Sequence, residues 1–172
     1  MKTIALLLAI TFVLVSCEGE KEEVKLDNSV IGEEAYRYAM PKDGKFVHPK
    51  HGEEKWFAYG AINGVGDTPA NGVAQAYNYE DGTSALTVQL NISQAPEGKF
   101  YEVWIAGEDP ADLASAGHLT NYFGDARHQL SFETNDDLSS RLSVLVTLES
   151  DDGEPAPSPL LVAQGTLRPT MR

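Results

Sequence analysis

The sequence predicts an all-β domain, an antiparallel two-sheet β-sandwich of the immunoglobulin-like kind. Three observations point to this class. Apolar and polar residues alternate along 82–92 and 140–149, as they do in half-buried strands. Asp81-Gly82 stands between two strand-like runs, and turn residues recur about every ten positions elsewhere. After an N-terminal leader, roughly 140 residues remain, enough for one domain that buries a core without disulfides.

The alternation is clearest where Leu86, Val88 and Leu90 are separated by polar residues. A hairpin is expected at Asp81-Gly82, because this dipeptide suits the tight turn between antiparallel strands. Further strands are expected over 73–79, 100–106 and 142–148 and, from weaker patterns, over 56–62, 129–133 and 160–167. Only Pro110–Ala116 resembles a helical element, a short helical turn. Gly64 and Gly66 precede no helix, so a turn is expected there.

The N-terminus has the pattern of a secretory signal. Lys2 is followed by the apolar run Ile4–Val15 and then by Ser16-Cys17. A helix of this run would measure roughly 18 Å, which is short of the roughly 30 Å hydrocarbon core of a bilayer. Residues 1–16 are therefore interpreted as a signal peptide.

Leu14-Val15-Ser16-Cys17 resembles the processing signal of bacterial lipoproteins. That resemblance implies that Cys17 carries palmitate or a similar acyl chain, becomes the mature N-terminus and anchors the chain to membrane lipid on the extracytoplasmic side of the cell envelope. Cys17 is the single cysteine, so no disulfide within one chain competes for it. Two alternatives remain: a secretory signal with an incidental cysteine, and an uncleaved structural segment.

Composition constrains the part of the chain beyond the anchor. Residues 17–25 are expected to form the lipidated, acidic tether and residues 26–172 a single domain. Segment 33–62 is interpreted as an N-terminal extension that turns at Asp43-Gly44 and lies against the sandwich, or as a partner-binding arm.

The chain holds 13 basic and 26 acidic residues, for a net charge of −13. Nucleic-acid binding is disfavoured, because phosphate recognition needs clustered Lys and Arg.

Four short motifs occur in order along residues 84–167. They begin at Gly98, Ser115, Val146 and Pro157 and read GKFYEVWI, SAGHL, VTLE and PS, the last leading to GTL at 165–167. Together they resemble the extracytoplasmic C-terminal domain of anti-sigma-K factors. The resemblance implies a β-sandwich that serves as the sensory or interaction part of a regulator, and no direct contact with a sigma factor is expected of this chain.

The matched residues also make sense as structure. Tyr101 and Trp104 should lie on opposite faces of one strand, so that one fills the core and the other covers an edge. Gly117 should permit a tight chain reversal with close backbone approach. Glu149 is expected to be a turn-stabilising or solvated carboxylate, with a cation-binding corner as the alternative.

Catalytic and metal motifs are weak in this sequence. It contains no Gly-x-Ser-x-Gly elbow and no His-Glu-x-x-His pair. His48 and His51 stand three apart, and His118 lies beside the small-residue motif, but a zinc or copper site needs three or four convergent ligands. No metal, cofactor or catalytic residue is therefore expected.

Two functional hypotheses remain. The first is a membrane-anchored, non-enzymatic binding or sensing module that contacts an unknown protein or envelope polymer. The alternative is a small envelope metal-binding protein or enzyme that uses a loop site of histidines and carboxylates around His48, His51 or His118.

Overall fold

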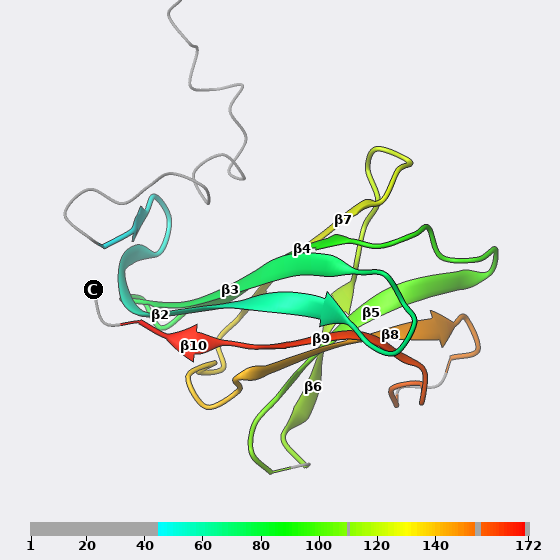
Figure 1. The fold of residues 1–172 in the computed structure, drawn as a ribbon. Helices are drawn as coiled ribbons and strands as arrows, with labels where there is room; N and C mark the ends of the chain where they lie inside the picture. The colour runs from blue at the N-terminus through cyan, green and yellow to red at the C-terminus, as the bar shows by residue number, and fades with distance from the viewer. Residues whose placement is uncertain (1–44, 110, 154–155, 171–172) are drawn as a thin grey trace, which may run out of the picture. The chain divides into compact units, whose positions relative to one another are not determined.

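The computed structural model describes residues 45–109, 111–153 and 156–170 (Figure 1). Cys17 and the expected signal, tether and Asp43-Gly44 turn lie outside these residues. The strands are β1 (Val47–His48), β2 (Gly52–Gly64), β3 (Asn71–Tyr79), β4 (Ser84–Asn91), β5 (Lys99–Ala106), β6 (Leu113–His118), β7 (Arg127–Thr134), β8 (Ser143–Ser150), β9 (Leu161–Thr166) and β10 (Arg168–Pro169).

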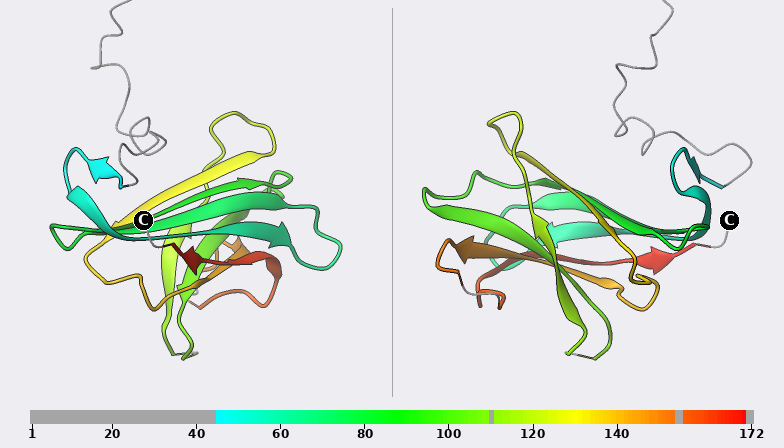
Figure 2. Two further views of the ribbon diagram at one scale, coloured as in Figure 1. Left: turned by 60° about the vertical axis from the view of Figure 1, so that its left-hand side comes forward. Right: turned by 180° about the vertical axis from the view of Figure 1, so that it is seen from behind.

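The strands pair in the order β6-β5-β8-β9-β2-β3-β4-β7, and every pairing is antiparallel. The short strands β1 and β10 both pair with β2. The all-β, antiparallel prediction is thus confirmed. Hydrogen bonds join the strands into one continuous sheet that bends over on itself, with β5 and β6 crossing steeply beneath β2, β3 and β4 (Figures 1 and 2). The expected division into two separate sheets is not seen.

The two edges of this sheet approach each other, so that it is nearly closed into a barrel. After β6 the chain forms one bridge to β7, in which the backbones of Thr120 and Gln129 exchange hydrogen bonds of 2.8 and 2.9 Å. In the described part of the chain, this pair is the single ladder contact between the two edges.

The core lies between the facing halves of the bent sheet. Its centre is made of fully buried aliphatic side chains from β4, β5 and β8: Leu86, Val88, Leu90, Val103, Ile105, Val144 and Val146. The alternation read in the sequence is therefore an alternation between the core face and the outer face of the sheet, although Ala85 and Thr87 on the outer face are buried as well. The Asp81-Gly82 hairpin is confirmed as well, since Gly82 adopts a φ of 87° in the turn between β3 and β4.

The expected helical turn at Pro110–Ala116 is wrong over the residues that the structure describes. From Leu113 onward this segment is strand β6, which pairs with β5 through Leu113–Ala106 and Ala114–Ile105. Pairing to a strand with free hydrogen-bonding groups outweighs the weak helical preference of the small residues. Within the described residues there is no helix of the length and apolar character needed to cross a membrane.

Candidate functional site: an uncharged sheet face and its covered neighbour

The outer face of β2, β3, β4 and β7 carries the candidate site. Residues that stand directly opposite each other in antiparallel strands place their side chains on the same face. The register therefore defines three outward rows, which we call the amide face: Tyr59–Gln75–Thr87–Ser131, Ala61–Val73–Gln89–Gln129 and Asn63–Asn71–Asn91–Arg127.

The amide face carries almost no charge. Six of its twelve positions are Gln or Asn, and Arg127 is the only charged residue, although the chain contains 26 acidic residues. Arg127 itself is neutralised, because its Nη2 lies 2.7 Å from Oδ2 of Asp125. The hydrogen bond from Arg127 holds the pKa of Asp125 below its usual value. The cation also stacks on an aromatic ring, with the Arg127 Cζ 4.1 Å from the centre of Phe123.

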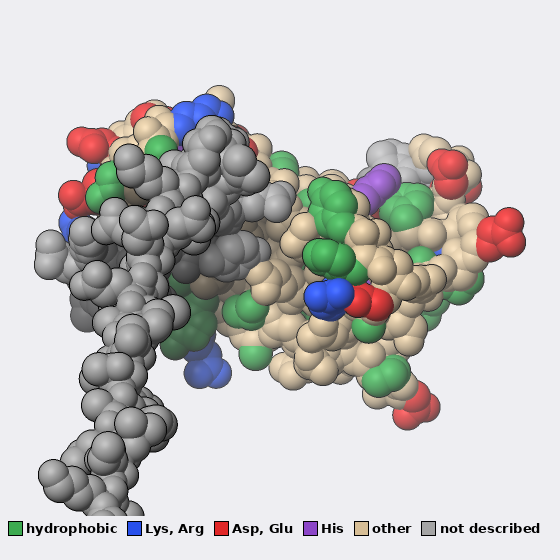
Figure 3. All heavy atoms as spheres, turned by 90° about the horizontal axis from the view of Figure 1, so that it is seen from above, with side chains coloured by type: hydrophobic (Ala, Val, Ile, Leu, Met, Phe, Trp, Pro, Cys, Tyr) green, Lys and Arg blue, Asp and Glu red, His purple; other side chains and the backbone are tan. Residues whose placement is uncertain are grey.

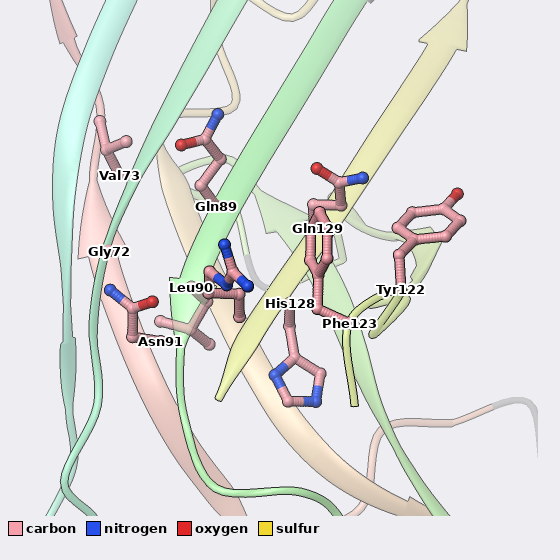
Figure 4. Close-up of a pocket in the computed structure, with 10 residues that line it drawn as sticks. Gly72, Val73, Gln89, Leu90, Asn91, Tyr122, Phe123, His128 and Gln129 are labelled. Carbon is pink, nitrogen blue, oxygen red and sulfur yellow. The ribbon is translucent and has the colours of Figure 1, made fainter. Parts of the chain in front are cut away.

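A hollow of about 330 Å³ lies at one side of this face, between the strands and the loop 119–126. Figure 4 shows that Gln89 and Gln129 point to the same side as the Tyr122 ring, whereas His128 points the opposite way. The rings of Tyr122 and Phe123 are both 64 % exposed. Seen from above, the described surface shows hydrophobic side chains next to basic and acidic ones (Figure 3).

The loop that presents the two rings is held by its own polar groups. Gly124 adopts a φ of 67° and donates its backbone N–H to Oδ1 of Asn121 over 2.6 Å. Asn121 also donates to the carbonyl of Asp125, and Gln94 donates to the carbonyl of Gly124. These bonds hold the turn without core contacts from Tyr122 and Phe123, whose rings stay exposed, with Arg127 over one face of Phe123.

The other end of the same outer face is covered. Here the outward residues are aromatic, and Phe57, Tyr77 and Tyr79 are each less than a tenth exposed. Residues 45–51, which include β1, lie over them: the Phe46 ring is 5.9 Å from that of Tyr77, and His51 stacks on Tyr79 at 5.5 Å. We call this region the covered end.

His48 and His51 lie within the covered end, with their rings stacked 4.7 Å apart and each only 5 % exposed. Nδ1 of His51 lies 2.8 Å from Oδ2 of Asp81, and this bond is the main cause that lowers the pKa of Asp81 to about 2. Nε2 of His51 is 3.7 Å from a carboxylate oxygen of Glu133. His51 thus ties the β1 segment to the β3–β4 turn through Asp81, while its buried Nε2 makes no hydrogen bond among the described residues.

The described residues contain no group of three or more His, Cys, Asp or Glu side chains arranged to hold a metal ion. His118 does not join His48 and His51: it lies on β6, with its ring 4.1 Å from that of Phe100. Of the three histidines singled out in the sequence, the structure brings two together, in an aromatic stack.

The motif residues of the sequence form a second, buried structure. The indole N–H of Trp104 donates to Oγ1 of Thr147 over 2.8 Å, and this hydroxyl donates to Glu149. Glu149, only 7 % exposed, accepts the backbone N–H of Ser158 over 2.9 Å. The carboxylate therefore fixes the β8–β9 loop, which is a turn-stabilising role and not a solvated one. These hydrogen bonds satisfy buried polar groups from three of the four sequence motifs. The three motifs therefore share a structural role.

Tyr101 and Trp104 are both buried, at 6 % and 5 % exposure, and Tyr101 belongs to the main core cluster whereas Trp104 does not. Tyr101 packs in the core and donates its hydroxyl to the carbonyl of Ser93 over 3.0 Å, and burial raises its pKa. Gly117, with a φ of 108°, does not reverse the chain: it lies within β6 beside a bulge, where Val103 pairs with Gly117 and Trp104 with Ser115.

Sequence reasoning missed the amide face and the two exposed rings. The sequence does carry a signal for the amide face, because the polar residues that alternate with apolar ones in these strands are mostly amides and not carboxylates. Strand order was needed to show that these amides lie side by side.

The protein is thus a small all-β domain. A series of hydrogen bonds from Trp104 through Thr147 to Glu149 holds its β8–β9 loop. The model of the anti-sigma-K factor RskA C-terminal domain matches residues 5–167, and the chain belongs to this family. The resemblance read over 84–167 is thereby confirmed and extends further, to a start inside the apolar run. Domains of this family are regulatory and not enzymatic. A comparison with curated proteins finds no match.

Proposed function

We propose that this protein is a lipid-anchored binding and sensing domain that works on the extracytoplasmic side of the membrane without catalysing a reaction. The observation that carries the proposal is the family match over residues 5–167, because it joins the apolar run and the β domain in one anti-sigma-factor-like unit. Leu14-Val15-Ser16-Cys17 supplies the anchor in this interpretation. An acylated cysteine with two or more chains holds a protein durably at a bilayer.

The surface of the described domain supports a binding role. The amide face carries a single charged residue, Arg127, which is paired to Asp125, and two exposed aromatic rings border it. Such a surface recognises a ligand through hydrogen bonds and packing. Two histidines of the alternative metal or enzyme hypothesis, His48 and His51, are instead enclosed among aromatic rings, and His118 lies apart from them on β6. A bound ligand would be reported onward through a partner of this domain.

Lipid attachment tests the anchor. The full chain is expressed in a bacterial host fed an alkyne-bearing fatty acid, and the label and the membrane fraction are measured. The wild-type protein should carry the label and sediment with membranes, whereas Cys17→Ser should lose the label and appear in the soluble fraction.

Ser16→Ala is the matched control, since it keeps a small residue before the cysteine and should be labelled like the wild type. Labelling that persists in Cys17→Ser, or a wild-type chain that carries no lipid, would overturn the proposal.

A further inference from the structure

The side-chain amides of the amide face have free hydrogen-bonding capacity. Each amide offers two N–H donors and one carbonyl acceptor without a charge. Within the residues that the structure describes, the side chains of Gln75, Gln89 and Gln129 make no hydrogen bond, and Asn91 donates one to Oδ1 of Asn71 over 3.0 Å. Such groups match hydroxyls and acetamides, which likewise both donate and accept.

Aromatic rings stand at the border of this polar surface. Tyr122 and Phe123 flank the hollow of about 330 Å³ and are exposed, although neither is needed for the core. The electron-rich face of an aromatic ring attracts the positively polarised C–H groups of an opposing molecule. Sugar rings present both kinds of group, hydroxyls at the edge and C–H bonds on the face.

The surface extends beyond a single small ligand. Asn63, on the third row of the face, also lines a second hollow of about 670 Å³, together with its pairing partner Gln164 of β9. The two hollows are thus linked by a row of amides that crosses β2, β3 and β4. A chain of several units fits this arrangement better than a monomer.

The charge pattern narrows the class of ligand. An anionic polymer would meet a chain of net charge −13 with a single basic residue in the three rows, which is paired to Asp125, and with Arg168 at the second hollow. A cationic polymer would find no carboxylate in the three rows. The ligand that the face accepts without an electrostatic penalty is neutral.

The layout of the face separates a sugar from a protein partner. Protein interfaces have an apolar centre and a polar rim, with aromatic and Arg side chains near the middle. On this face the central strands carry Gln75, Gln89 and the 6 % exposed Thr87 beside a single apolar side chain, Val73. The exposed aromatic rings stand at the two sides, with Tyr59 on β2 and Tyr122 and Phe123 beyond β7.

We propose that the amide face binds a neutral saccharide chain, with the amides of Gln89 and Gln129 contacting its hydroxyls and the rings of Tyr122 and Phe123 stacking on its sugar rings. The inference rests on the proposed function, because display outside the membrane is what would bring the domain to such a polymer. It names the class of ligand that the domain senses.

Binding is measured by titration calorimetry on the full chain purified in detergent. The neutral probes are the hexamer of N-acetylglucosamine, cellohexaose and laminarihexaose. The charged probes are the glucosamine hexamer, which differs from the first by its missing acetyl groups, and hexagalacturonate. At least one neutral probe should bind at least tenfold more tightly than both charged ones.

Two double variants test the residues, namely Tyr122→Ala with Phe123→Ala, and Gln89→Ala with Gln129→Ala. Each should weaken binding of the neutral probe at least tenfold. The controls Asn135→Ala and Leu160→Ala remove an exposed amide and an exposed apolar side chain elsewhere and should bind like the wild type.

Four outcomes would overturn the inference: no neutral probe binds, a charged probe binds as tightly, the double variants bind like the wild type, or the face proves to join two copies. The last is read by size-exclusion chromatography, where the double variants would convert a dimer to a monomer. Fatty-acid labelling of Cys17 is independent of these readouts, so failure of saccharide binding and failure of the anchor are told apart.

Discussion

The outer face of β2, β3 and β4 is covered at one end and open at the other, although the same strands form both. At the covered end, Phe57 and Tyr77 point outward and lie beneath Phe46, with 4 % and 7 % of their surface exposed. Two rows further along, the outward residues are Ala61, Val73 and Gln89, and no segment of the described chain lies over them. The part of the outer face with aromatic side chains is thus covered by another segment, and the part with small or amide side chains is not.

The comparison separates stability from recognition. Aromatic side chains at the covered end contribute hydrophobic burial, roughly 25 cal/mol for each Å² of apolar surface removed from water. Amides at the open end contribute little to folding, since water satisfies them equally well in the unfolded chain. The first end should therefore respond to mutation through stability and the second through binding.

The largest expected effect is that of Phe57→Ala. Removing this ring leaves a cavity beneath Phe46 and beside Tyr77, so the free energy of unfolding should fall by about 3–5 kcal/mol. Urea denaturation of the full chain, followed by tryptophan fluorescence, measures the change. A loss below about 1 kcal/mol would mean that residues 45–51 do not seal this end.

A smaller effect should follow from acidification. Hydrogen bonds from His51 and, second, from the backbone N–H of Thr83 lower the pKa of Asp81 to about 2, below the 3.8 of a free carboxyl, so the ionised form is stabilised in the folded state. This contribution is complete above pH 4 and is lost as the pH falls toward 2. Asp81→Asn should therefore flatten the decline in stability over that range, as measured by thermal unfolding at successive pH values.

Asp67→Asn is the control for this pH series, because it removes an exposed acid from a distant loop. An equal flattening in both variants would show that net charge, and not the His51–Asp81 bond, governs the response.

The smallest effect on stability is expected for Gln89→Ala. The side chain is exposed and makes no hydrogen bond within the described chain, so the free energy of unfolding should change by no more than about 0.5 kcal/mol. Chemical denaturation measures it beside Phe57→Ala. A loss comparable with that of the aromatic variant would erase the distinction between the two ends.

Local patterns in the sequence were enough for most of the strand assignments. The alternation at Leu86, Val88 and Leu90 and the Asp81-Gly82 turn were sufficient for β3, β4 and their hairpin, because both signals act between neighbouring residues. β6 was mistaken for a helical turn because its small residues have no strong β preference, and pairing with β5 decides its structure. The joining of all strands into one bent sheet depends on contacts between distant segments.

The candidate site was less accessible from the sequence than the fold. Gln89 and Gln129 are forty positions apart and become neighbours only through the pairing of β4 with β7. Tyr122 and Phe123 resemble core residues by type, and only the self-contained loop around Asn121 and Gly124 shows that they are surplus to the core. The buried link from Trp104 to Glu149 likewise joins motifs that stand apart in the sequence.

The single bridge between Thr120 and Gln129 has a mechanical consequence. It forms the seam of the nearly closed sheet, and the loop with Tyr122 and Phe123 begins at the same point. A molecule that binds those rings therefore binds next to the single pair of hydrogen bonds that joins the two edges in the described chain. If the ligand binds the closed and open forms of this joint with different affinities, binding shifts the opening equilibrium and opening shifts the affinity by the same factor.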